Sequence, residues 1–165
     1  MSRLTALTLA VVLLAGCQVT AGREAAGPTV TSQPATTSRV APATAAERAW
    51  VAGIAKLRRR LDRAIQVGTI ITHAKVDELY DFYRTCRPGV LKLEATPRLA
   101  EARQRALRAC RDYEAAGLAY RKTDPYLDTP SERVEALLDE AGEHQGNGSN
   151  RLLEAEAIAH EAWTP

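Results

Sequence analysis

Hydrophobic residues recur at intervals of three or four positions in the part of the chain that follows residue 44. The first stripe contains Trp50, Ile54, Leu57, Leu61, Ala64, Gly68 and Ile71. Because an α-helix has 3.6 residues per turn, this spacing predicts an amphipathic helix with one apolar face. The run 67–72 combines β-branched residues with a glycine, so a break or bend in the helix is expected there.

Two further stripes follow, and each is bounded by residues typical of helix ends. The second stripe contains Val76, Leu79, Tyr80, Tyr83 and Cys86. It is expected to stop at Arg87-Pro88-Gly89, because proline and glycine interrupt helices. The third stripe opens at Thr96-Pro97, an N-cap and a first-turn proline, and contains Leu99, Ala106, Cys110, Tyr113 and Tyr120. Between these two helices, residues 88–95 are expected to form a loop that packs alongside the bundle.

The C-terminal part is predicted to form two helices separated by a loop. Thr129-Pro130-Ser131-Glu132 has the pattern of a capping box, and Gly142 is expected to close the helix that it opens. Residues 143–150 are interpreted as a loop containing an Asn-Gly turn, and a short last helix is expected from Arg151 to about Ala162. The stripes together predict an all-α fold, a small bundle of four to five helices.

The composition agrees with one helical domain. The chain has 165 residues, of which 45% are hydrophobic, 25% are charged and only 5% are aromatic, which suits thin helix layers better than sheets. The formal net charge is +2, from 22 basic and 20 acidic residues. Such a near-neutral balance gives no general attraction to nucleic acid, and no nucleic-acid partner is expected.

The N-terminus has the order of an export signal. Arg3 is followed by an apolar run from Ala6 to Ala15 that only Thr8 interrupts. An uncleaved membrane anchor is the alternative, but a spanning helix needs about 20 apolar residues and this run is shorter.

The sequence Leu14-Ala15-Gly16-Cys17 resembles the lipobox of bacterial lipoproteins at all four positions. The resemblance implies cleavage by signal peptidase II between Gly16 and Cys17, and acyl chains such as palmitate attached through the Cys17 thiol. The mature protein would then be anchored to the extracytoplasmic face of the cell membrane without crossing it. The composition is similar to that of lipoproteins from high-GC Gram-positive bacteria, while the body of the chain resembles no characterised family.

The expected domains are therefore a signal peptide at 1–16, a lipidated cysteine and tether at 17–44, and a helical domain at 45–165. The tether is rich in Thr, Ala and Pro, lacks aromatic residues and shows no hydrophobic period, so a disordered stalk is predicted. O-glycosylation of its Thr and Ser residues is an alternative to a plain spacer role.

Two cysteines remain once Cys17 carries lipid. Cys86 and Cys110 lie on the apolar stripes of neighbouring helices, and an exported protein folds where disulfides form. A disulfide between them is predicted, and two buried free thiols are the alternative.

The most concentrated charge lies within the first predicted helix. Its basic face contains Lys56, Arg58, Arg59, Arg60 and Arg63. On a tethered domain such a face could dock to anionic lipid or to an anionic wall polymer. The alternative is a solvated face whose cations pair with acidic residues elsewhere in the bundle.

The sequence contains no recognisable catalytic motif. His73, His144 and His160 are far apart and lack the spacing of metal ligands, so neither a metal nor a cofactor is predicted. The aromatic residues Tyr80, Phe82, Tyr83, Tyr113, Tyr120 and Tyr126 are interpreted as core. The alternative is a ligand groove in which Asp81 or Arg84 could orient a polar ligand. The leading hypothesis is a non-enzymatic binding or accessory module that contacts another envelope protein through a helical face. Anionic docking and an unrecognised envelope enzyme are the other two.

Overall fold

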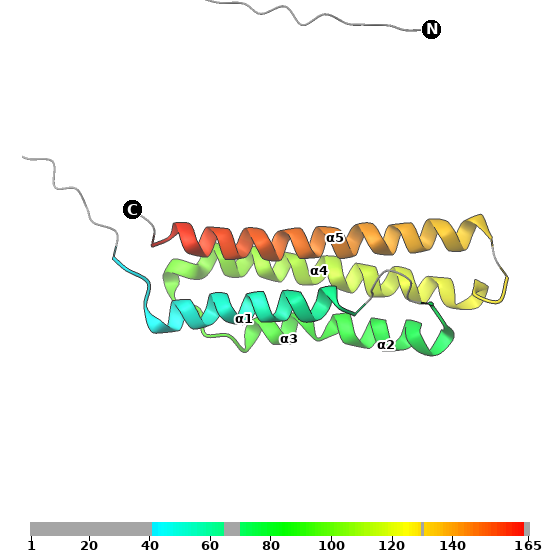
Figure 1. Cartoon of the computed structure of the whole chain (residues 1–165), viewed down its shortest axis with the longest axis horizontal. Helices are drawn as coiled ribbons and strands as arrows, with labels where there is room; N and C mark the ends of the chain where they lie inside the picture. The colour runs from blue at the N-terminus through cyan, green and yellow to red at the C-terminus, as the bar shows by residue number, and fades with distance from the viewer. Residues whose placement is uncertain (1–40, 65–69, 130, 164–165) are drawn as a thin grey trace, which may run out of the picture. The chain divides into compact units, whose positions relative to one another are not determined.

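The computed structural model describes residues 41–64, 70–129 and 131–163, and these ranges contain helices and no strand (Figure 1). The helices are α1 (Ala45–Asp62), α2 (His73–Arg84), the short α3 (Cys86–Leu91), α4 (Ala100–Thr123) and α5 (Glu132–Glu161). Two 3₁₀ turns, η1 (Pro97–Leu99) and η2 (Asp124–Tyr126), precede and follow α4. The prediction of an all-α bundle is confirmed. The predicted signal peptide, Cys17 and most of the tether lie outside the described residues.

The two longest helices, α4 and α5, lie side by side along most of their length (Figure 1). α1 packs against α5 and α3, and α2 packs against α4. The core between them consists of one large hydrophobic residue per turn from α1 and α2 and mostly alanines from α4. Within the described ranges, no helix combines the length and the apolar composition needed to cross a membrane.

The predicted disulfide is present. Cys86 at the start of α3 is bonded to Cys110 in the middle of α4, and both residues are buried. The bridge joins positions 24 residues apart, and closing a loop of that size stabilises a fold by about 3 kcal/mol in the chain-entropy account. It fixes the end of α2 and all of α3 against α4.

The predicted stop at Pro88-Gly89 is wrong, because α3 continues through both residues. The interruption falls earlier, at Thr85, whose hydroxyl donates to the Phe82 carbonyl at 2.7 Å. Pro88 is the third residue of α3, where a backbone N–H would lack a helical partner in any case. A Cβ on Gly89 would lie 3.2 Å from Leu57 Cδ1, so this glycine lets α3 approach α1 closely. The packed loop therefore begins at residue 92 and not at 88.

The predicted loop at 143–150 is also wrong, because α5 runs without interruption from Glu132 to Glu161. Gly148 is buried, and a Cβ there would lie 2.8 Å from the Tyr113 ring and 3.2 Å from the Ala109 carbonyl oxygen. Contact with α4 thus favours the helix over the turn preference of Asn-Gly. A Cβ added at Gly142 would meet nothing within 4 Å, and α5 continues through this residue.

Two of the predicted N-caps lack a side-chain cap hydrogen bond. Ser131 is the N-cap of α5 and makes no such bond, so the expected capping box is absent. Thr96 is the N-cap of η1 and Pro97 follows it in the first turn, as predicted, but the Thr96 hydroxyl does not cap the backbone. A reciprocal capping box forms instead at α1, between Thr44 and Glu47.

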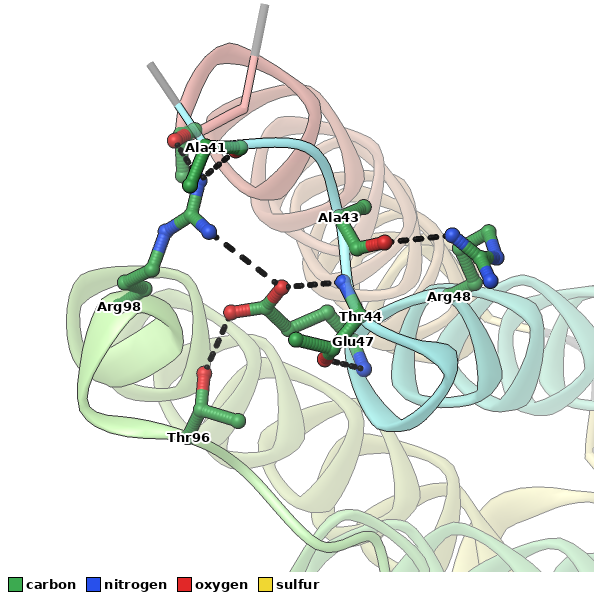
Figure 2. Close-up of polar contacts among 8 residues, drawn as sticks. Ala41, Ala43, Thr44, Glu47, Arg48, Thr96 and Arg98 are labelled. Carbon is green, nitrogen blue, oxygen red and sulfur yellow. Dashed lines mark hydrogen bonds and ion pairs between the residues drawn. The ribbon is translucent and has the colours of Figure 1, made fainter. Parts of the chain in front are cut away.

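Glu47 is the centre of a cluster at the end of the bundle where the described chain begins (Figure 2). Its side chain is only 1% exposed, and it accepts hydrogen bonds from the Thr44 N–H at 2.8 Å and the Thr96 hydroxyl at 2.9 Å. Arg98 lies 3.6 Å from the same carboxylate. One nitrogen of Arg98 also donates to the carbonyl oxygens of Ala41, at 2.9 Å, and of Ala162, at 2.6 Å. The cluster therefore joins the start of the bundle, the 96–98 segment and the end of α5.

Replacing Gly148 by alanine is expected to destabilise the bundle by about 1–3 kcal/mol, because the added methyl overpacks the α4–α5 contact. The matched control is Gly146→Ala, two residues away in the same helix, where a Cβ meets nothing within 4 Å. This control should gain about 0.5–1 kcal/mol from helix propensity. Urea unfolding followed by circular dichroism compares the two variants, and equal midpoints would contradict the packing role of Gly148.

The acid sensitivity of the fold should depend on Glu47. The backbone N–H of Thr44, which donates to the carboxylate, is the main cause that lowers the pKa of Glu47 below its ordinary value of 4.5. A lowered pKa contributes stability that is present above about pH 4.5 and is lost as the pH falls through the folded-state pKa. Glu47→Gln should therefore be less stable than wild type at pH 7, and the difference should shrink on acidification. Glu78→Gln, on the surface of α2, is the control and should show no such convergence.

Candidate anion-binding groove

A groove of about 570 Å³ lies between α1, the end of α2 and α3. Its lining consists of Arg60, Asp81, Arg84, Thr85, Pro88, Gly89 and Lys92. A second hollow of about 210 Å³ shares Arg60 and Gly89 with it and is also lined by Lys56 and Leu93. The two hollows bring four basic side chains from three segments to one concave surface, which we call the basic groove: Lys56, Arg60, Arg84 and Lys92.

The fold explains why these residues converge. Lys56 and Arg60 are four residues apart on α1 and therefore share one face of that helix. Arg84 is the last residue of α2, and Lys92 directly follows α3. Gly89 lets α3 approach Leu57 of α1, and Arg84, two residues before α3, and Lys92, directly after it, line the same hollow as Arg60.

Two of the four cations are held in position by neutral groups. Arg60 donates to the Thr85 hydroxyl oxygen at 2.8 Å, and its guanidinium carbon lies 5.4 Å from the centre of the Phe82 ring. Arg84 lies 5.4 Å from the centre of the Tyr80 ring. These contacts orient the guanidinium groups without neutralising their charge, and several N–H donors of each remain available.

None of the four cations forms an ion pair with a carboxylate in the part of the chain that the structure describes. Asp81 is the single acidic residue of the lining and makes no ion pair there. Arg58 behaves differently, because it pairs with Glu156 at 3.0 Å and with Asp62 at 3.6 Å. The groove thus presents unneutralised positive charge.

The predicted basic face is divided by the structure. Lys56 and Arg60 line the groove, while Arg58 is committed to ion pairs with α5 and α1. Arg63 donates to the carbonyl oxygen of Arg59 at 3.0 Å, and Arg59 itself is exposed outside the lining. The predicted basic face did not include Arg84 or Lys92, since the expected stop at Pro88-Gly89 hid the short helix that brings them to α1; Arg84 was considered only beside the aromatic residues of the alternative ligand groove.

Of the aromatic residues assigned to the core, Tyr83, Tyr113 and Tyr120 are buried, Tyr80 and Phe82 are partly buried, and Tyr126 is exposed. Tyr83 lies between Tyr113 and Tyr120, with ring centres 5.4 and 6.4 Å apart, and all three are buried. The Tyr113 hydroxyl donates to Asp62 at 2.6 Å, and the Ser149 hydroxyl donates to the other oxygen of that carboxylate at 3.0 Å. Burial is the main cause that raises the pKa of Tyr83 and of Tyr113 above the ordinary value of 10. Both phenols therefore stay protonated at physiological pH and act as structural groups.

The histidines do not assemble a site. His73 at the start of α2 lies 2.7 Å from an Asp124 oxygen and 3.4 Å from an Asp128 oxygen, and the hydrogen bond with Asp124 is the main cause that raises its pKa. His144 lies 4.0 Å from Glu140. Over the described ranges, no group of three or more His, Cys, Asp or Glu side chains has an arrangement that could hold a metal ion.

Comparison of the chain with protein-family models, with curated proteins and with solved structures found no significant match.

Proposed function

We propose that this protein is a lipid-anchored, extracytoplasmic, non-enzymatic module whose basic groove binds an anionic group of another envelope component. The observation on which the proposal depends is the convergence of four cations, none of them paired with a carboxylate in the described ranges, on one concave surface. Like charges held together repel one another, and a bound anion would relieve that repulsion. Among the functions compatible with the sequence, anionic docking therefore fits the geometry better than contact through an undifferentiated helical face.

The positions of Arg60 and Arg84 support binding. Long cationic side chains lose rotamer freedom when they bind a ligand, which reduces affinity. Arg60 has lost part of that freedom already, because Thr85 and Phe82 hold it, and Tyr80 does the same for Arg84. The groove is thus partly preorganised for an anion such as a phosphate, which guanidinium groups bind through two parallel N–H donors.

The chemistry of the lining favours binding over catalysis. The larger hollow is lined by one carboxylate, one threonine and three cations, with no histidine, cysteine or serine among its residues. Such a set offers electrostatic attraction and hydrogen-bond donors. It offers neither an activated nucleophile nor a matched acid and base.

Two features support the extracytoplasmic placement. The Leu14-Ala15-Gly16-Cys17 motif resembles a lipobox. The Cys86–Cys110 disulfide is a bond that persists in oxidising compartments and is rare in the cytosol. The two features are independent, since one lies in the N-terminal leader and the other within the bundle.

Inorganic pyrophosphate added to the ¹⁵N-labelled mature chain, residues 17–165 with Cys17→Ser, should shift the backbone amide signals of Thr85 and Gly89. The double variant Arg60→Gln/Arg84→Gln should lose these shifts, because it removes two of the charges while keeping a polar side chain at each position. The matched control is Arg111→Gln/Arg133→Gln, which removes two exposed arginines elsewhere, one of them stacked on Tyr126. Shifts that persist in the groove variant, or that vanish in both, would contradict the groove as the binding site.

The anchor is tested by the intact mass of the protein extracted from membranes of its own host. The expected mass is that of residues 17–165 plus acyl groups, and Cys17→Ala should abolish the acylated form. Alkylation should reach Cys86 and Cys110 only after reduction. An unmodified full-length mass in the soluble fraction would overturn the proposed location and leave the groove experiment unaffected.

A further inference from the structure

We infer that the anionic surface met by the basic groove is the head-group layer of the membrane that holds the anchor, so that the bundle docks with α1 and α3 facing lipid. This inference rests on the proposed function. Two observations beyond the cations lead to it: an exposed leucine directly before Lys92 of the groove lining, and the length of chain between the groove and Cys17.

Leu91 is the last residue of α3 and is 47% exposed, directly before Lys92 of the groove lining. Arg87, one helical turn earlier on the same side of α3, is exposed as well. A single exposed leucine on a protein surface needs no explanation by itself. Beside a cluster of cations, however, it reproduces the combination with which proteins lie on membranes, where apolar side chains enter the acyl boundary and cations meet the head groups.

The combination of an exposed leucine with cations distinguishes a lipid surface from other anionic partners. A soluble polyanion, such as a phosphate-containing wall polymer, would contact the cations and leave Leu91 in water. A membrane offers partners to both kinds of side chain, and each cation near an anionic surface strengthens binding about fivefold. The joint presence of Leu91 and the cations therefore favours a lipid surface.

The position of the groove along the chain also fits a membrane partner. The chain between Cys17 and Ala41 contains 24 residue steps, which span at most about 80 Å. From Thr44 to Lys56 and Arg60 the distance along α1 is roughly 18 to 24 Å, at 1.5 Å per residue. Cys17 and the groove can thus meet the same surface at once. The linkage gives the groove a high effective concentration of lipid, on the order of millimolar, so that even weak contacts hold it down.

The geometry of the bundle defines the docked face. α1 and α3 are in contact with each other, while α5 packs on α1 from another side and α4 contacts α3 (Figure 1). Docking through the groove therefore brings α3 and Leu91 to the lipid. The hollow between α4 and α5, which Leu118 and His144 line, is formed by other elements and takes no part in this contact.

The test is flotation of the mature chain, residues 17–165 with Cys17→Ser, with vesicles of phosphatidylcholine containing about one third phosphatidylglycerol. This form lacks both the lipid and the apolar leader, so binding reports on the folded domain. It should bind these vesicles and not vesicles of pure phosphatidylcholine. Lys56→Gln/Lys92→Gln should weaken binding about 25-fold, at about fivefold per cation.

Leu91→Ser is the decisive variant. It should weaken vesicle binding roughly fivefold, because a half-exposed leucine no longer enters the interface. It should leave the pyrophosphate-induced shifts unchanged. The matched control is Leu153→Ser on α5, whose side chain is 45% exposed, and this control should bind vesicles like the parent chain.

The outcomes separate this inference from the proposed function. Pyrophosphate binding without vesicle binding, or vesicle binding that Leu91→Ser does not weaken, would overturn the inference. Either result would remain consistent with the anion-binding groove. Tighter binding to soluble poly(glycerol phosphate) than to the vesicles, again insensitive to Leu91, would identify a wall polymer as the partner and overturn it too. Absence of pyrophosphate binding by the chain with its native groove residues would refute both proposals.

Discussion

The close approach of α4 and α5 is the constraint on which the rest of the bundle depends. α4 offers alanines along the contact, and α5 offers Gly148, Ala155 and Ala159, so that the two backbones approach closely near Gly148, where an added Cβ would lie 3.2 Å from the Ala109 carbonyl oxygen. Small residues bury less apolar surface each, but they allow many backbone atoms to come into van der Waals contact. The pair thus forms a platform. On it rest α1, which packs on α5, and the α2–α3 segment, which packs on α4 and is bonded to it through Cys110.

The same constraint determines where polar groups can be buried. With Tyr113 pressed against Gly148, its hydroxyl reaches Asp62 at the end of α1, and Ser149 reaches the same carboxylate from α5. Three helices therefore share one carboxylate. Arg58, one turn earlier on α1, contacts Asp62 and Glu156 and completes the link. The division of the predicted basic face follows from this arrangement, because Arg58 faces the platform whereas Lys56 and Arg60 face α3.

The local sequence pattern predicted the features that depend on hydrophobic periodicity. It failed where contacts between residues distant in sequence determine whether a segment is helical. The apolar stripes identified α1, α2 and α4, because burying one face of a helix requires apolar residues every three or four positions. Cys86 and Cys110 both lie on such stripes, and this placement identified the disulfide. Glycine and proline were misread at 88–89 and 142–150. Their local preference is for turns, but a helix neighbour that only the fold reveals stabilises the helix there, as Leu57 does at Gly89 and Tyr113 at Gly148. The groove was half predicted for the same reason: its α1 cations form a run in the sequence, whereas Arg84 and Lys92 join them only through the tertiary contact of α3.

The cluster around Arg98 has a mechanical consequence. One guanidinium nitrogen holds the carbonyl oxygens of Ala41 and Ala162, so the first and last described helices are tied together at a single point. A pull along the N-terminal segment would otherwise peel α1 from the bundle one turn at a time, beginning at Thr44. With Arg98 in place, part of the load passes to the end of α5, and the hydrogen bonds of Arg98 to Ala41 and Ala162 must break before α1 can peel away.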